Sequence, residues 1–267
     1  MGGRAQVMSA LTEEEQLAYQ ADGFVIRRNQ FTHSLMARVN RALDIAEKEL
    51  LAAASIDGRA YDMDGRPFVD IGHRTLQFEF GEAWTEARQL RVVEPIADCT
   101  PLLDWLVRTP QMTGPIQSIL SCNRLSLWTD KLNFKAAGGT GFEWHQDAPY
   151  WTPVADSVAE MPNVMVALDQ ASEASGCLRG IRGSHLGGAH PGKQDGSPLA
   201  GFYTDPACFD LTAAVNFEVN AGDLIIFDPF LVHGSTDNNT SNRRRALIVT
   251  YQPADQPSLK SGRVINL

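Results

Sequence analysis

The sequence predicts a mainly β fold, an all-β sandwich or jelly roll with flanking helices. After residue 115 the chain consists of short apolar or alternating runs that Gly, Pro, Asn and Asp separate, and helical patterning is nearly absent. This spacing is typical of antiparallel sandwiches and barrels. The runs are RLSLWTDKLNFK, NVMVALDQ, CLRGI, VNFEV, DLIIFD and ALIVTYQ.

The N-terminal part is expected to be largely helical. Thr12 followed by Glu15 forms a capping box, which predicts a helix that ends at Gly23, and FVIRR then reads as a strand. Apolar residues at helical spacing predict a second helix over 34–54. Three further segments are expected: a loop over 57–66, a strand over 73–80, and a helix over 91–107 that is interrupted before Pro101.

Length and composition favour one domain. The 267 residues are 43% hydrophobic, which suffices for a sizeable core, and neither an internal repeat nor a low-complexity linker is visible. The N-terminal helical part has no core of its own. We therefore expect a single domain over 1–267, in which residues 10–110 pack on a β core over 115–255.

Charge and cysteine usage exclude several function classes. The net charge is 23 − 32 = −9, so the chain has no long-range attraction for nucleic acid or an anionic membrane. No apolar run reaches eighteen residues, and no apolar signal core opens the sequence. The four cysteines form no CxxC pair, which favours reduced core residues and the cytoplasm. They are Cys99, Cys122, Cys177 and Cys208.

The stretch GFEWHQDAPYW holds a candidate metal site. His145 and Asp147 are two residues apart, and on a strand such residues point to the same face. An imidazole and a carboxylate supply two-thirds of a 2-His-1-carboxylate set, which leaves three positions of an octahedral Fe(II) open. His233 is the best third ligand, because it follows the apolar strand in DLIIFDPFLV.

A lone His-x-Asp pair is a weak signal, because it often arises by chance. The other histidines have ordinary structural explanations, which we prefer. We expect His33 to cap a helix or lie at the surface, His73 to be exposed at a strand start, His185 to make turn contacts, and His190 to lie in a loop.

Arg244 strengthens the case for a site. It lies 244 − 233 = 11 residues beyond His233 and opens an apolar strand. A buried guanidinium needs an anionic partner, and no acidic residue is nearby in sequence, so a ligand carboxylate is the expected partner. Arg243 and Arg245 point the other way by alternation, and we expect them to mark a solvated strand start.

Five motifs together resemble the phytanoyl-CoA dioxygenase-like family of Fe(II)/2-oxoglutarate-dependent oxygenases. They are ADGFVI, WHQD, SGCLRGIRGSH, AGDLIIFDPFLVHGS and NRRRALIVTY, in the family's order over residues 19–251. The resemblance implies a double-stranded β-helix, the cupin-like jelly roll. It also implies an enzyme that uses Fe(II), 2-oxoglutarate and O2, abstracts hydrogen from a substrate C–H bond, and releases succinate and CO2.

The resemblance also implies roles for individual residues. His145, Asp147 and His233 match the iron ligands, and Arg244 and Ser235 match the residues that bind the C5 carboxylate of 2-oxoglutarate. Lys131, Asn133 and Lys135 share one strand face where the family often places a further cosubstrate contact, and we favour Lys131 or Asn133.

Two positions bear on how closely the family pattern holds. Arg182 replaces the proline of the family's Pro-Gly-Ser-His turn. This difference bears on the rigidity of the turn and not on the reaction. Related halogenases carry a small residue in place of the carboxylate ligand, whereas Asp147 is present here, so halogenation is not expected.

The substrate is expected to be a small organic molecule, such as a natural-product intermediate. Hydroxylation, desaturation, epimerisation and ring formation all begin with hydrogen abstraction, so the outcome stays open. Segments 57–90 and 186–210 are the expected lid and substrate loops. The candidate substrate contacts, each of which could equally be a core residue, are Tyr150, Trp151, Phe78, Phe80, Trp84 and Phe202.

Two other function classes remain open. One is an O2-independent jelly-roll hydrolase or isomerase that binds Zn2+ or Mn2+ at the same ligands, and activity without O2 would support it. The other is a non-catalytic binding protein of the same fold. A missing metal ligand would favour that reading, and here all three candidates are present.

Overall fold

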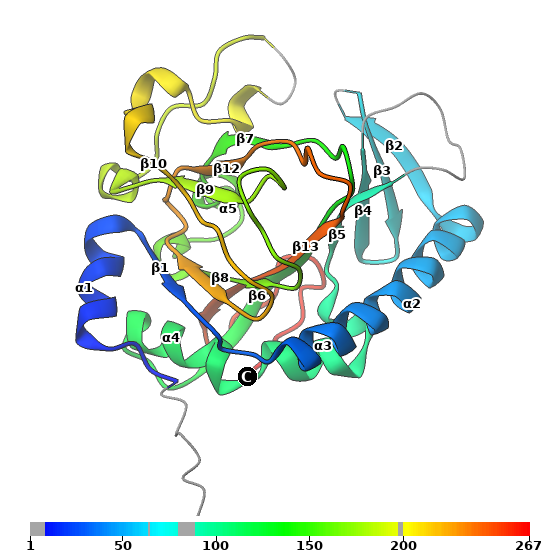
Figure 1. Cartoon of the computed structure of the whole chain (residues 1–267), viewed down its shortest axis with the longest axis horizontal. Coiled ribbons are helices and arrows are strands. Elements are labelled where there is room, and N and C mark those ends of the chain that lie inside the picture. Colours follow the sequence, from blue (N-terminus) through cyan, green and yellow to red (C-terminus); the bar gives the residue numbers. More distant parts are fainter. Residues whose placement is uncertain (1–8, 64, 80–88, 197–199) are drawn as a thin grey trace, which may run out of the picture.

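Two antiparallel sheets form the centre of the protein (Figure 1). The computed structural model describes residues 9–63, 65–79, 89–196 and 200–267. In these residues, the larger sheet has nine strands in the order β1 (Phe24–Arg27), β11 (Leu224–Phe227), β8 (Asn163–Ala167), β13 (Arg244–Pro253), β6 (Leu125–Lys135), β5 (Leu90–Glu94), β4 (Arg74–Phe78), β3 (Arg66–Ile71) and β2 (Arg59–Met63). The smaller sheet has the order β10 (Ala214–Asn216), β9 (Leu178–Ile181), β12 (His233–Ser235) and β7 (Phe142–His145).

The two sheets face each other across an apolar core. Alternate residues of the central strands, such as Met165 on β8 and Ile248 on β13, belong to the same buried cluster as Leu178 of the small sheet. Their neighbours Val164 and Leu247 belong to the cluster on the opposite face. This alternation is what two packed antiparallel sheets require, and the predicted mainly β jelly roll is confirmed.

Helices cover the outer face of the larger sheet. The long helix α2 (His33–Asp57) buries Met36, Val39, Leu43 and Leu50, and full burial of each such side chain stabilises the fold by about 1.5–3 kcal/mol. In α1 the predicted capping box of Thr12 and Glu15 is present, and Gly23 ends the helix in the left-handed region at φ 83°. The helices are α1 (Glu13–Asp22), α2, α3 (Pro101–Val107), α4 (Pro110–Leu120) and α5 (Ala148–Trp151), with short 3-10 turns at Ala97–Cys99, Val158–Glu160, Ser184–Gly187, Ala200–Phe202, Pro206–Cys208 and Leu211–Ala213.

The N-terminal part contains more strand than the sequence predicted. The expected loop over 57–66 holds β2, which pairs with β3. The expected helix over 91–107 begins as β5, continues through the 3-10 turn at Ala97–Cys99, and becomes α-helical only at Pro101. Strand β2 has no buried residue, so it lacks the apolar alternation that identifies a strand. Helix α4 begins at Pro110, where no helix was expected.

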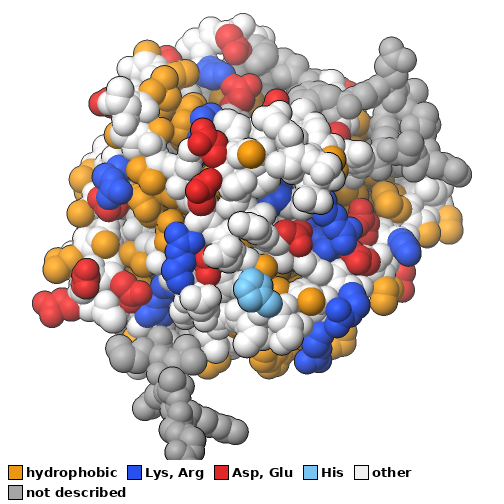
Figure 2. Space-filling model, viewed as in Figure 1, with side chains coloured by type: hydrophobic (Ala, Val, Ile, Leu, Met, Phe, Trp, Pro, Cys, Tyr) orange, Lys and Arg blue, Asp and Glu red, His pale blue; other side chains and the backbone are white. Residues whose placement is uncertain are grey.

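The surface carries charges of both signs, and the cysteines are not paired in disulfides. Figure 2 shows basic and acidic side chains interspersed on one face of the molecule, without a large field of one sign. Across the part of the chain that the structure describes, no helix has the length and apolar character that crossing a membrane needs. All four cysteines, which are among the described residues, are free thiols, but only Cys177 is buried, and the other three are half-buried rather than core residues.

Candidate functional site

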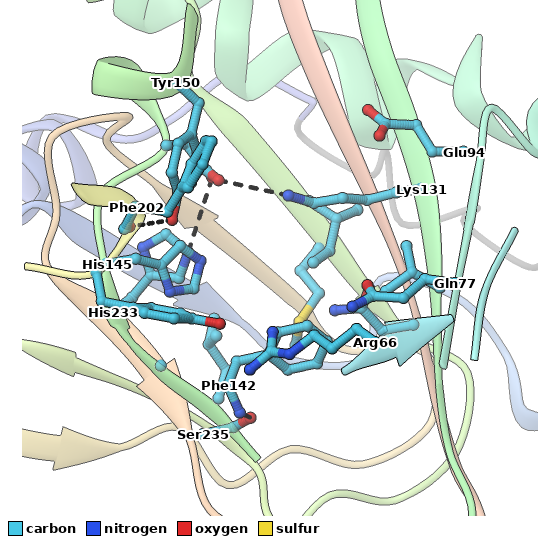
Figure 3. Close-up of a pocket in the computed structure, with 18 of the residues that line it drawn as sticks. Arg66, Gln77, Glu94, Lys131, Phe142, His145, Tyr150, Phe202, His233 and Ser235 are labelled. Carbon is cyan, nitrogen blue, oxygen red and sulfur yellow. Dashed lines mark hydrogen bonds and ion pairs between the residues drawn. The ribbon is translucent and has the colours of Figure 1, made fainter. Parts of the chain in front are cut away.

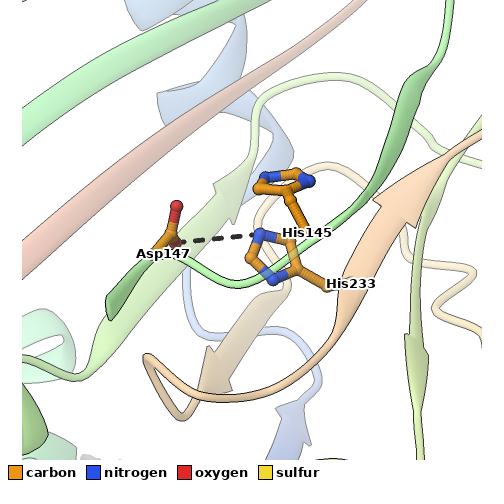
Figure 4. Close-up of side chains that lie close together, drawn as sticks. All are labelled: His145, Asp147 and His233. Atoms are coloured by element: carbon orange, nitrogen blue, oxygen red, sulfur yellow. Dashed lines mark ion pairs between the residues drawn. The ribbon is translucent and has the colours of Figure 1, made fainter. Parts of the chain in front are cut away.

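His145, Asp147 and His233 come together where β7 and β12 pair (Figure 4). His145 lies directly opposite His233 in the register of the two strands, and their ring centroids are 4.2 Å apart. Asp147 was expected on the same strand as His145, but β7 ends at His145 and Asp147 is the N-cap residue that immediately precedes helix α5. The turn nevertheless directs its carboxylate to the histidines, because one ligand atom from each of the three residues lies within 4.8 Å of the others.

Backbone carbonyls orient both imidazoles. Nδ1 of His145 lies 2.7 Å from the carbonyl of Glu143, and Nδ1 of His233 lies 2.9 Å from that of Leu231. A neutral ring that donates from Nδ1 presents the lone pair of Nε2, which is the form that binds a metal ion. Nε2 of His233 lies 3.7 Å from Oδ2 of Asp147. Two imidazole nitrogens and one carboxylate fit Fe(II) as a facial set.

Burial and neighbouring charges keep the three ligands in the protonation states that bind a metal ion. Burial alone would raise the pKa of Asp147, but Lys131 and the two imidazoles outweigh it and lower the pKa to about 2. Burial, followed by the neighbouring His233, lowers the pKa of His145 to about 3, and burial also lowers the pKa of His233. At neutral pH the site therefore offers one carboxylate and two neutral imidazoles.

Two side chains fix the carboxylate of Asp147, which is 1% exposed. Asn163 donates a hydrogen bond from Nδ2 to Oδ2 over 3.0 Å. Nζ of Lys131 lies 3.4 Å from Oδ1. Partners of this kind hold a ligand's orientation before the metal ion arrives.

The three ligands open into a cavity of about 340 Å³ between the sheets (Figure 3). One wall is a row of residues in register across β3, β4, β5 and β6, namely Phe68, Gln77, Val92 and Asn133. In the view of Figure 3, Glu94 and Lys131 lie at the upper end and Phe142 and Ser235 at the lower end. The cavity is therefore polar at both ends.

Arg244 lines the cavity with Ser235 and is 4% exposed. It donates from Nη2 to the carbonyl of Gly176, whereas its Nε has no hydrogen-bond partner and its guanidinium no ion pair among the described residues. Burial lowers the pKa of Arg244 to about 10, so it stays charged at neutral pH. A buried cation without an acidic partner fits a ligand carboxylate such as the distal end of 2-oxoglutarate.

The three residues proposed for the further cosubstrate contact separate into two groups. Lys131 and Asn133, which the sequence favoured, line the cavity, and Oδ1 of Asn133 is buried without a hydrogen-bond partner among the described residues. Lys135 instead directs its ammonium into hydrogen bonds with Gly176, Ser235 and Thr236.

Of the candidate substrate contacts that the structure describes, two line the cavity and two lie in apolar clusters away from it. Tyr150 and Phe202 line the cavity, with ring centroids 5.1 Å apart. Trp151 packs edge-on against Trp128 in a separate apolar cluster, and Phe78 lies in the main core, so for these two residues the structure favours the core position that was equally expected. Phe80 and Trp84 lie outside the described residues.

Several cavity residues were missed by sequence reasoning. Gln77 and Glu94 face the cavity by simple strand alternation, which could have found them once the sheet was known. Arg66 and Tyr203 lie in the segments expected to carry substrate loops, and the guanidinium of Arg66 lies 5.6 Å from the Tyr203 ring centroid.

The remaining histidines do not line the cavity. His185 lies 3.1 Å from the carbonyl of Gln20, and His190 lies 3.1 Å from that of Ser184. His73 pairs with Asp98 at the surface. His33 is exposed in the first turn of α2, whose cap is Thr32.

The expectation for Arg245 was wrong. Arg243 is exposed, but Arg245 is 1% exposed and forms ion pairs with Asp44 at 2.8 Å and with Asp169 at 3.5 Å. Both partners are remote in sequence, so the local pattern of three arginines could not reveal them.

Comparison with known proteins identifies the same family as the motifs. A family model described as Phytanoyl-CoA dioxygenase (PhyH) matches residues 19–246. A 2-aminoethylphosphonate dioxygenase from Uncultured bacterium HF130_AEPn_1 is 33% identical over 128 residues, which are 47% of this chain and 45% of that protein. A probable alpha-ketoglutarate-dependent hypophosphite dioxygenase from Stutzerimonas stutzeri is 28% identical over 70% of this chain and 65% of that protein. The chain thus spans about half to two-thirds of the length of these relatives.

Solved structures support the fold. The crystal structure of EctD from S. alaskensis with 2-oxoglutarate and 5-hydroxyectoine matches with a TM-score of 0.66 and 20% identity, over 98% of this chain and 80% of that one. At this identity the match establishes the architecture, which is the jelly roll that the sequence predicted.

Proposed function

Because the chain belongs to the phytanoyl-CoA dioxygenase family, we propose that it is an Fe(II)/2-oxoglutarate-dependent oxygenase. It abstracts hydrogen from a small organic substrate and releases succinate and CO2. One observation carries the proposal: His145, Asp147 and His233 form a compact metal-ligand set in the same cavity as the buried Arg244, which has no ion pair among the described residues. A metal site alone fits many reactions, whereas a metal site beside a buried carboxylate receptor fits a 2-oxo diacid.

The residues of the chain bind and orient the reactants. Nε2 of each histidine and the carboxylate of Asp147 would hold the iron, and Arg244 and Ser235 would hold the C5 carboxylate of 2-oxoglutarate. When bound, the iron supplies the activation of O2 that drives the decarboxylation of 2-oxoglutarate and the oxidation of the substrate. The apolar walls at Met165, Leu178 and Ile248 exclude water from the reacting centre.

The size of the cavity favours a small substrate, such as a natural-product intermediate. At about 340 Å³ it lies at the low end of the about 300–1,000 Å³ typical of ligand pockets, and it must also hold the cosubstrate. A CoA thioester enclosed whole does not fit this space. The two relatives described above are named for 2-aminoethylphosphonate and hypophosphite, which are also small. Hydroxylation or a related oxidative tailoring step is the proposed outcome.

Succinate release from a panel of small organic molecules tests this function. Active compounds should lose all substrate-dependent succinate formation in His145→Ala and Asp147→Ala, while the matched control His190→Ala keeps it. A ligand variant with full turnover would rule out the metal assignment. Turnover that continues without O2 would instead support the O2-independent metalloenzyme.

We also infer a single domain over residues 1–267 and a cytoplasmic location. Support for the domain comes from α2, which shares a buried cluster with strands β8 and β13. The four free thiols support a reducing compartment. Neither nucleic acid nor membrane is a proposed partner of this acidic chain.

A further inference from the structure

Lys135 and Arg244 form a buried pair of basic residues beside one end of the cavity, which only Arg244 lines. They lie directly opposite each other in the register of β6 and β13, and they are 1% and 4% exposed. Burial, followed by the charge of Arg244 and that of Arg91, lowers the pKa of Lys135 to about 7. Among the described residues Lys135 forms no ion pair. Two adjacent buried cations are costly unless an anion approaches them.

The ammonium of Lys135 contacts the residues beside Ser235 and Arg244, the proposed ligands of the C5 carboxylate. Its Nζ donates to Oγ of Ser235 over 2.7 Å, to the carbonyl of Thr236 over 2.6 Å, and to the carbonyl of Gly176 over 3.2 Å. The same Gly176 carbonyl accepts a hydrogen bond from Nη2 of Arg244. Lys135 therefore connects Ser235 to the turn that holds Arg244.

Glycine is required at the centre of this arrangement. Gly176 has a φ of +65°, and a Cβ at this position would lie 2.2 Å from the carbonyl oxygen of Thr236. The close approach brings the Gly176 carbonyl within reach of Lys135 and Arg244 together.

The hydrogen bonds to Ser235 determine what its hydroxyl can do. Its Oγ accepts from Nζ of Lys135 and also from the backbone N–H of Phe142 over 3.2 Å. A hydroxyl oxygen has two acceptor lone pairs and one proton. While Lys135 is protonated, both lone pairs are engaged, so Ser235 can form a further hydrogen bond only as a donor, and Ser235 lines the cavity. A ligand carboxylate can accept this hydrogen bond from Ser235. A ligand group that can only donate, such as an amide N–H, would find no acceptor there.

We propose that Lys135 is a positioning residue that makes Ser235 an obligate donor and holds the Gly176 turn, so that this end of the cavity selects a 2-oxo acid with a distal carboxylate. The proposal rests on the proposed function, because it assigns this end of the cavity to 2-oxoglutarate. Lys135 does not line the cavity and acts through Ser235 and Gly176.

A comparison of two 2-oxo acids tests the proposal. 2-Oxopentanoate has the same carbon chain and the same chelating head as 2-oxoglutarate, but a methyl group replaces the distal carboxylate. Dissociation constants of both acids are measured anaerobically on the Fe(II)-loaded full chain, from the weak visible band of the iron chelate. Lys135→Met should weaken 2-oxoglutarate about tenfold to a hundredfold and leave 2-oxopentanoate nearly unchanged.

The controls separate a positioning role from a general structural one. Phe134→Leu changes the neighbouring residue, whose side chain lies in the core on the opposite face, and should leave the preference between the two acids intact. Ser235→Ala should reduce the preference for 2-oxoglutarate over 2-oxopentanoate as much as Lys135→Met does. The variant that combines both substitutions should reduce this preference little further. If Lys135→Met does not fold, the uncharged Lys135→Gln is expected to show the same direction of change.

The contradicting outcomes are distinct. Equal weakening of both acids, or of neither, would overturn the role of Lys135. If the wild-type protein binds iron but forms no chelate with either acid, the proposed function fails, and the proposal for Lys135 fails with it.

Discussion

The side-chain amide of Asn163 donates a hydrogen bond of 3.0 Å to Oδ2 of Asp147, and both side chains are almost wholly buried. Thr250 donates in turn from Oγ1 to Oδ1 of Asn163 over 2.6 Å, which turns the amide nitrogen toward the carboxylate. The two partners lie on β8 and β13, so the large sheet orients a ligand that comes from a loop beside the small sheet.

Replacing Asn163 with Leu should weaken metal binding about tenfold to a hundredfold, because Asp147 loses the donor that orients it. Thr250→Val should have a smaller effect in the same direction. Fe(II) affinity by anaerobic competition with a chelator measures both. Ser126→Ala removes another buried hydroxyl of the large sheet, remote from the site, and serves as the control. Unchanged affinity in Asn163→Leu would contradict the assigned role.

Metal affinity should fall less between pH 7 and pH 5 than it would for two ordinary histidines. Burial and the neighbouring His233 lower the pKa of His145 to about 3, so a metal ion displaces no proton from this imidazole in that range, and burial lowers the pKa of His233 as well. Two histidines with the ordinary pKa of about 6.5 would instead lose affinity by a factor of about 10³ at pH 5. Fe(II) titrations at several pH values distinguish the two cases.

The same shifts predict how the stability of the metal-free protein depends on pH. Below pH 6.5 the unfolded imidazoles bind protons that the folded ones do not, so these two residues lower the free energy of unfolding as the pH falls. Urea unfolding at pH 7 and pH 5 measures this change. In His233→Phe the loss of stability on acidification should be smaller, and an unchanged loss would contradict the pKa assignment.

Arg245→Ala should destabilise the protein by about 1–3 kcal/mol, because it leaves Asp44 and Asp169 without their buried partner. Arg243→Ala should stay within about 0.5 kcal/mol, because Arg243 is exposed. The two adjacent residues form a matched pair, and urea unfolding compares them. Equal losses would mean that the ion pairs of Arg245 do not distinguish it from a surface arginine.

Trp151→Ala should lower the free energy of unfolding more than Tyr150→Ala does. Trp151 is buried against Trp128, so its removal should cost about 3–5 kcal/mol of unfolding free energy. Tyr150 lines the cavity, so its removal should cost about 1 kcal/mol and mainly weaken substrate binding. Thermal unfolding, together with the KM of any substrate found, tests this contrast.

Residue patterns that are local in sequence predicted much of the site. The spacing of His145 and Asp147, the strand before His233, and the alternation at Arg244 are all readable within a few residues, and the structure brings these residues together. The capping box at Thr12 was equally local.

The missed features depend on contacts that are distant in sequence. The burial of Arg245 requires Asp44, which lies 201 residues away. Strand β2 is held by pairing with β3 rather than by its own apolar pattern. Trp151 and Tyr150 are adjacent and chemically similar, and only the packing of α5 decides which of them faces the cavity.

Anaerobic titration of the metal-free protein with Fe(II) and then 2-oxoglutarate separates an oxygenase from the two other function classes. The weak visible band of the iron chelate should appear in the wild-type protein, and Arg244→Ala should lose it at modest cosubstrate concentrations. Iron that binds at His145, Asp147 and His233 without any such band would contradict the proposed function and favour an O2-independent metalloenzyme or a binding protein.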